Sequence, residues 1–200
     1  MARRTPFPET LQPDSGLGER LREERGITVF DCYQCRKCTA GCPATFAMDV
    51  YPHEVIRLTG LGQADLVLEC NTIWVCAACQ TCTTRCPNDI DIAGVMDYLK
   101  ESALKTHRPI PQKDVAAFHQ VFLDDIRLSG GRLHEALLFR MYTGRSGGAM
   151  AKILEGRFMG DLKVGFELFR KGRLRLKPPK RIHDIEGFME LFRKAGVVLR

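Results

Sequence analysis

Two copies of one cysteine pattern constrain this chain of 200 residues more than any other feature. Each copy reads C-x2-C-x2-C-x3-C followed by proline, and together they hold eight of the nine cysteines. The runs consist of Cys32, Cys35, Cys38 and Cys42, and of Cys76, Cys79, Cys82 and Cys86. This is the bacterial-type ligand run for a [4Fe-4S] cluster, because cysteines spaced so closely can reach three corners of one cubane from a single loop. The sequence therefore predicts two [4Fe-4S] clusters.

The fourth cysteine of each run is predicted to serve the cluster of the other run. In proteins that carry two such runs, the fourth ligand crosses between the clusters. We therefore expect one cluster to be held by Cys32, Cys35, Cys38 and Cys86. The other cluster would be held by Cys76, Cys79, Cys82 and Cys42. This crossing would tie the two halves of the segment together through iron.

Disulfides and zinc fit the pattern less well than cubane clusters. Cysteines packed three residues apart are badly placed to pair with separated partners, and disulfides need an oxidising compartment. A zinc site usually combines two separated C-x2-C pairs, or cysteine with histidine. Because all eight predicted ligands are cysteines, no iron has an open position for a substrate. The chain is therefore predicted to move electrons and to have no catalytic residue of its own.

A few other polar residues near the runs invite a functional interpretation. Arg36, Lys37 and Arg85 lie inside the loops, where positive charge could raise a reduction potential. Solvated loop charges are an equally good interpretation. Cys70 lies outside both runs at a helical position, which favours a buried small side chain over a redox role. His53, like the other histidines on predicted helices, has no partner cysteine or carboxylate cluster and is interpreted as packed or exposed.

The residues around the runs predict helices instead of hairpins. Pro52 suits the first turn of a helix that ends at Gly60, and residues 63–70 predict a second, shorter helix. Asp91 can cap a helix in which apolar residues recur at helical spacing. Residues 73–75 predict an apolar approach to the second run. They match a brief extended approach to the first run at residues 27–30.

The chain ends also favour helices. Ser15 can cap a helix that stops at Gly26. Beyond a proline-containing linker at 107–111, apolar stripes predict two helices, one with Val115, Phe118, Phe122 and Ile126 on one face and one over residues 133–141. A weaker helix is predicted over residues 149–158.

The predicted fold class is mainly α. It consists of a two-cluster domain over residues 1–106 and a helical C-terminal extension over residues 107–200.

The formal charge of +6 is concentrated at one end of the chain. Residues 1–149 contain 17 basic and 18 acidic side chains, whereas residues 150–200 contain 13 basic and 6 acidic ones. Basic residues alternate with apolar ones over residues 163–181, which fits either a solvated face or a docking arm. The sequence contains no apolar run of about 18 residues that could cross a membrane and no apolar core of an export signal after Arg4, so the cytoplasm is the expected location.

The two runs resemble those of the iron-sulfur C subunit of heterodisulfide reductases. The resemblance rests on the residues within and between the cysteines at 32–43 and 74–87, on residues 89–92, and more loosely on residues 171–174 and 178–180. It implies an α-helical ferredoxin whose two clusters relay electrons from a flavin-containing heterodisulfide reductase A-like subunit to a cysteine-rich, disulfide-reducing B-like subunit. The chain departs from fused relatives because it has no Cys-Cys-Gly motif after Cys86. A substrate site would therefore lie on another polypeptide.

Two other functions are compatible with the sequence. The basic tail would also suit the iron-sulfur subunit of a quinone-linked, membrane-associated oxidoreductase. A nucleic-acid-binding protein with structural clusters is a third hypothesis, but the tail contains no recognisable groove-reading or base-stacking motif. The leading hypothesis is an electron-transfer subunit of an oxidoreductase complex that acts on a disulfide.

Overall fold

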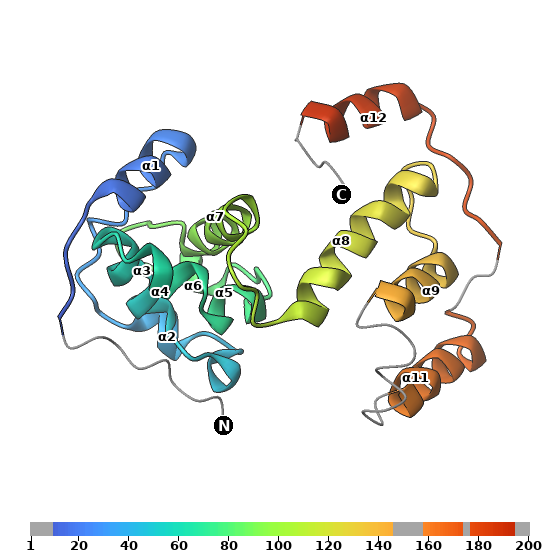
Figure 1. Ribbon diagram of the computed structural model, residues 1–200, viewed down its shortest axis with the longest axis horizontal. Helices are drawn as coiled ribbons and strands as arrows, with labels where there is room; N and C mark the ends of the chain where they lie inside the picture. The colour runs from blue at the N-terminus through green and yellow to red at the C-terminus, as the bar shows by residue number, and fades with distance from the viewer. Residues whose placement is uncertain (1–9, 146–157, 174–176, 195–200) are drawn as a thin grey trace. The chain divides into compact units, whose positions relative to one another are not determined.

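The computed structural model describes residues 10–145, 158–173 and 177–194, and this part of the chain contains helices and no strand. The chain divides into two compact units, Met1–Gln112 and Lys113–Arg200. In the first unit (Figure 1) the elements are α1 (Gly16–Arg25), α2 (Lys37–Ala40), the 3-10 helix η1 (Thr45–Ala47), α3 (Pro52–Gly60), α4 (Ala64–Leu68), α5 (Asn71–Val75), α6 (Thr81–Thr84) and α7 (Ile92–Lys105). In the second unit they are α8 (Lys113–Leu128), α9 (Glu135–Arg145), α11 (Phe158–Arg170) and α12 (Ile185–Lys194). The mainly α fold class is confirmed.

Helix α7 forms the centre of the first unit. It contacts α3, α4, α5 and α6, while α1 packs on α3 and α2 packs on both α3 and α6. The side chains of Leu21, Ile56, Ile73, Val95 and Leu99 are almost fully buried between these helices. Burying an aliphatic side chain of this size contributes about 1.5–3 kcal/mol relative to leaving it exposed. The two short helices that carry cysteines, α2 and α6, are therefore held against a packed apolar core.

Helices α3 and α7 begin where the sequence predicts. Pro52 is the first residue of α3, and the Glu54 carboxylate accepts a hydrogen bond from the backbone N–H of the N-cap residue Tyr51 (2.8 Å). The Asp91 carboxylate accepts a hydrogen bond from the N–H of Gly94 (3.0 Å) at the start of α7. Such caps satisfy backbone donors that have no partner within the helix.

The cap of α1 differs from the prediction. Ser15 occupies the N-cap position of α1 but makes no side-chain cap hydrogen bond. The carboxylate of Asp14 instead accepts a hydrogen bond from the N–H of Gly16 (2.9 Å). At the other end Gly26 stops the helix with φ of 68°, as predicted, since glycine has no Cβ to oppose a left-handed conformation.

The approach to the second run is helical instead of merely apolar. Residues 73–75 belong to α5, which starts at Asn71 and ends directly before Cys76. The helix predicted over 63–70 is shorter and spans only α4, although Val67 and Cys70 are buried as expected. The reason for the helical turn in α5 is a remote cap, described below.

In the second unit α8 packs against α9, and its buried residues coincide only in part with the predicted apolar stripe. Phe118 is partly exposed and meets Tyr142 edge to face, whereas Val121 is fully buried. Asp125 is also buried, and its carboxylate accepts hydrogen bonds from the Ser129 hydroxyl (3.2 Å) and the His134 N–H (2.7 Å). The buried residues of α8 thus include a carboxylate that holds the connection to α9.

Helix α11 presents an apolar face to solvent. Its Gly165 lies against α9, because a Cβ there would be 2.8 Å from Cζ of Phe139. The exposed apolar side chains on one stripe of α11 are Met159, Leu162, Phe166 and Phe169. Residues 149–157 of the helix predicted over 149–158 lie outside the described residues.

Candidate iron-sulfur site

The two cysteine runs share one backbone conformation. In the first loop Gln34 and Arg36 have φ of 60° and 64°, on either side of Cys35. In the second loop the residues at the matching positions, Ala78 and Gln80, have φ of 50° and 62°. The left-handed region costs a non-glycine residue about 1–2 kcal/mol. Left-handed residues within a turn can direct backbone N–H groups toward one concave side, as is found around phosphate and Fe–S sites.

Each loop runs into a short helix that carries its third cysteine. Arg36 and Gln80 are the N-cap residues of α2 and α6, and Cys38 and Cys82 lie on these helices. The Thr83 hydroxyl of α6 donates to the carboxylate of Asp91, the N-cap residue of α7 (3.1 Å). The third cysteine of each run is thus placed by a helix, while the second cysteine lies at the tip of a loop and is exposed.

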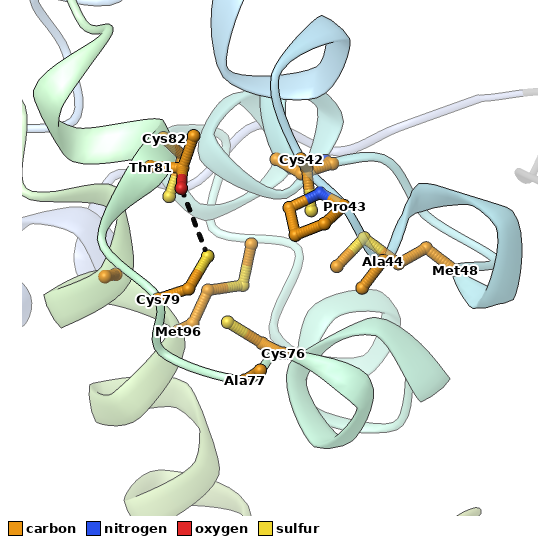
Figure 2. Close-up of a pocket in the computed structure, with 12 residues that line it drawn as sticks. Cys42, Pro43, Ala44, Met48, Cys76, Ala77, Cys79, Thr81, Cys82 and Met96 are labelled. Carbon is orange, nitrogen blue, oxygen red and sulfur yellow. Dashed lines mark hydrogen bonds between the residues drawn. The ribbon is translucent and has the colours of Figure 1, made fainter.

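A pocket gathers one cysteine of the first run with three of the second. Figure 2 shows Cys42, Cys76, Cys79 and Cys82 around this pocket, whose remaining wall is mostly apolar and includes Met96. The four cysteines are the set that the crossed ligand pattern predicts for one cluster. Soft thiolate donors in an apolar shell fit an iron-sulfur cluster.

The other predicted ligands lie around the first loop. The Gln34 side-chain amide donates to the sulfur of Cys32 (3.2 Å) and to the backbone carbonyl of His53 (3.1 Å). The end of the second run is connected to the start of the first one, because the Asn88 side-chain amide donates to the backbone carbonyl of Asp31. Cys86 precedes Asn88 by two residues. This contact brings the segment with Cys86 to the segment with Cys32.

A polar contact holds the first loop against α3. The Thr39 hydroxyl lies 2.8 Å from Nδ1 of His53, and the backbone N–H of His53 donates to the same hydroxyl (3.3 Å). His53 is buried, so of the two interpretations that the sequence allowed, packed or exposed, the first applies. It therefore acts as a packed connector between α2 and α3.

A remote carboxylate caps the helix that leads into the second loop. The Asp49 carboxylate accepts hydrogen bonds from the backbone N–H groups of Asn71 (2.9 Å) and Thr72 (3.0 Å), and from the Thr72 hydroxyl (2.9 Å). These N–H groups belong to the first turn of α5 and have no acceptor within the helix. Sequence reasoning missed this cap because Asp49 lies 22 residues before Asn71.

The thiols differ in how readily they ionise. Burial raises the pKa of Cys38 and that of Cys76. It also raises the pKa of Cys82, to about 11. At the exposed loop tip the Thr81 hydroxyl, 3.4 Å from the Cys79 sulfur, lowers the pKa of Cys79 because it can donate to the thiolate. Metal ligation needs deprotonated thiols, so assembly at the buried positions releases protons.

A largely buried positive charge beside a predicted ligand comes from Lys100, which sequence reasoning missed. Its ammonium donates to the backbone carbonyl of Cys76 (3.2 Å), and its side chain is only 13% exposed. Lys100 follows Met96 by one helical turn on a face of α7 that is otherwise apolar, which is the signal that could have identified it. The loop residues Arg36, Lys37 and Arg85, considered from the sequence, are all exposed.

All nine cysteines are free of disulfides. No three His, Cys, Asp or Glu side chains of the described residues surround a point that could hold a single metal ion. Residues 31–90 match the family model described as a 4Fe-4S dicluster domain. This segment is a 4Fe-4S dicluster domain. The match indicates two [4Fe-4S] clusters, as the sequence predicts.

The chain with this dicluster domain has curated homologues named as the C subunit of heterodisulfide reductases. It is 28% identical over 106 residues to the C subunit of the H2:CoB-CoM heterodisulfide, ferredoxin reductase of Methanothermobacter marburgensis, covering 52% of this chain and 57% of that one. It is 30% identical over 125 residues to the iron-sulfur C subunit of the CoB–CoM heterodisulfide reductase of Methanopyrus kandleri, covering 59% and 65%. It is 33% identical over 97 residues to the C2 subunit of the H2/formate:CoB-CoM heterodisulfide, ferredoxin reductase of Methanococcus maripaludis, covering 48% and 52%.

The chain thus spans between about half and two thirds of the length of these relatives. The predicted resemblance to the C subunit of heterodisulfide reductases is confirmed over this stretch. None of the described helices combines the length and apolar character that crossing a membrane requires.

Proposed function

We propose that this chain is the electron-transfer subunit of a cytoplasmic heterodisulfide reductase-like complex. In this proposal it relays single electrons between a flavin-containing A-like subunit and a cysteine-rich B-like subunit that reduces the disulfide. The homologues named as C subunits support the assignment to such a complex. The single observation that carries the role of this chain is the apolar pocket that gathers Cys42 with Cys76, Cys79 and Cys82.

The ligand sets are part of the proposal. Cys42, Cys76, Cys79 and Cys82 hold one cluster around the pocket, and Cys32, Cys35, Cys38 and Cys86 hold the other. Support for the second set comes from the contact of Asn88 with Asp31 and from the shared conformation of the loops. When bound, [4Fe-4S] clusters supply one-electron transfer.

Apart from the cysteine ligands, the residues of the chain position the clusters and form no covalent bond during electron transfer. The apolar side chains and the packed helices α3 and α7 restrict water around the thiolates, which favours a defined redox potential. The exposed cysteines at the two loop tips, Cys35 and Cys79, bring each site to the protein surface. Partners can therefore exchange electrons with either site by docking at a loop tip.

Anaerobic isolation of the tagged chain from its native cells tests this function. Iron and acid-labile sulfide are counted, reduction is followed by EPR, and bound proteins are identified by mass spectrometry. We expect two clusters with reversible one-electron reduction, and recovery with a flavoprotein and a cysteine-rich protein. Clusters that cannot be reduced reversibly would exclude electron transfer. Recovery with a membrane cytochrome instead would favour the quinone-linked alternative, and recovery with nucleic acid would favour the third hypothesis.

A further inference from the structure

Helices α3 and α7 occupy equivalent places after the two cysteine runs. Counted from their N-cap residues, Tyr51 and Asp91, the two helices bury the same positions over their first two turns. Gly60 and Lys100 hold the same position in this count. A Cβ on Gly60 would face Val29 and Phe30, which come just before Cys32, whereas Lys100 contacts Cys76. Within this count of the two helices, the match therefore ends at a residue that lies beside the second loop.

The environment of Lys100 keeps its charge close to the second loop. Its ammonium lies 3.2 Å from the Cys76 carbonyl and 3.3 Å from the carboxylate of Asp97. The Lys100 side chain is 13% exposed, whereas that of Asp97 is 56% exposed. The carboxylate thus lies on the solvent side, where water and salt screen it, while the ammonium lies on the protein side.

A fixed positive charge favours the more negative oxidation state of a cluster. Reduction adds one electron, so a cation near the ligand thiolates stabilises the reduced form and raises the reduction potential. The attraction is stronger where the cation is partly buried than where it is surrounded by water. At the first loop Gln34 donates to a ligand sulfur and acts in the same direction, but its amide carries no net charge, whereas Lys100 brings an ammonium to the Cys76 carbonyl.

We propose that Lys100 raises the reduction potential of the cluster bound by Cys76, Cys79, Cys82 and Cys42, so that the two clusters differ in potential and an electron rests preferentially at this one. The inference rests on the ligand sets of the proposed function. The step is the transfer of one electron from a donor such as the reduced flavin of the proposed partner.

Anaerobic redox titration of the holo protein, followed by EPR, tests the role of Lys100. The variant Lys100→Met keeps an unbranched side chain of similar length without the charge. We expect the midpoint potential of one cluster to fall while that of the other stays close to its original value. At a fixed potential the ratio of reduced to oxidised protein at that cluster should fall about tenfold, which is about 59 mV for one electron.

Control variants distinguish the local effect of the Lys100 charge from a general effect of changing a charged residue in α7. Lys105→Met removes a lysine from the same helix that is 67% exposed and pairs with Glu101, and we expect no shift at either cluster. Lys100→Arg keeps the charge and should keep the potential. Asp97→Asn removes the opposing carboxylate and should raise the potential of the same cluster by less than Lys100→Met lowers it.

Three results would overturn the proposal. They are an unchanged potential in Lys100→Met, an equal shift at both clusters, and an equal shift in Lys105→Met. If Lys100→Met protein does not bind clusters, the Lys100→Arg and Asp97→Asn titrations decide the matter, since a potential that is insensitive to Asp97→Asn also contradicts it. Iron and sulfide counts of the unaltered protein test the proposed function separately, because two reducible clusters can be present whatever Lys100 does.

Discussion

The two cysteine loops share their ligand spacing and their backbone conformation, but different side chains surround them. The first loop is held by neutral polar contacts, from Gln34 to Cys32 and from Thr39 to His53. The second loop follows a helix capped by Asp49 and lies beside the ammonium of Lys100. The shared features determine what each loop can bind. The differences act on the stability and the potential of each site, which makes them separable by mutation.

The largest effect, a loss of bound iron, is expected from replacing the fourth cysteine of either run with serine. Cys42→Ser and Cys86→Ser should each lose about half of the bound iron, because each removes one ligand from one cluster. If the ligands cross, the cluster that remains in Cys86→Ser is the one next to Lys100. Adding Lys100→Met should then shift the remaining midpoint potential in Cys86→Ser protein and leave it unchanged in Cys42→Ser protein.

Iron analysis and EPR titration of these double variants provide the measurement, and Cys70→Ala, which changes no predicted ligand, is the control for iron content. The opposite pattern of sensitivity to Lys100→Met would show that each run holds its own cluster.

The remote cap should matter more than the contact between α2 and α3. Asp49→Ala removes the acceptor for two N–H groups of α5 and should lower the free energy of unfolding by about 2 kcal/mol. Thr39→Val removes the hydroxyl that contacts both Nδ1 and the backbone N–H of His53, and should cost about 1 kcal/mol. Denaturant unfolding of the holo proteins, followed by circular dichroism, measures both. An equal loss in the two variants would contradict the stronger role of Asp49.

Replacing Ala78 or Gln34, which hold matching positions in the two loops, with glycine should change the stability of the holo protein in opposite directions. Ala78 has φ of 50° and no side-chain hydrogen bond, so Ala78→Gly should stabilise the holo protein by about 0.5–1 kcal/mol by relieving the left-handed strain. Gln34→Gly relieves the same strain but loses the hydrogen bonds to Cys32 and His53, with a net loss of about 1 kcal/mol. The same unfolding experiment applies. Stabilisation by both substitutions would show that the Gln34 amide contributes little.

The smallest effect is expected at the cysteine outside both loops. Cys70 is buried, and burial raises the pKa of its thiol to about 11. The thiolate is the reactive form, so Cys70 should resist alkylation in the folded protein at pH 7 and react only after unfolding. Peptide mass spectrometry after brief treatment with iodoacetamide detects this difference. Rapid labelling of Cys70 in folded holo protein would contradict its burial.

Local sequence patterns were sufficient for part of the fold and of the site. The cysteine spacing predicted the two clusters, and Pro52 and Asp91 marked the starts of α3 and α7, because caps and ligand runs depend on neighbouring residues. Crossed ligation stays a prediction. The roles of Asp49 and Lys100 could not be predicted from local patterns, for the same reason. Each acts on a residue more than 20 positions away, and only the packing of helices brings such residues together.

The helix faces beyond residue 113 were harder to predict for a related reason. The apolar stripe with Phe118 suggested the buried face of α8, yet Asp125 is buried there because it binds the connection to α9. Apolar periodicity reports an average preference and contains no information about a carboxylate that finds its partners after the chain turns.

The exposure of Cys35 and Cys79 also determines how such a protein is damaged by air. Dissolved oxygen and peroxide reach these two loop tips without any opening of the helices, whereas Cys38 is buried. Sulfur that loses its iron at an exposed position is the first to be oxidised to sulfenic acid, since this reaction requires access and thiolate character. Oxidative loss of iron is therefore expected to begin at the corners of the clusters through which electrons would enter and leave.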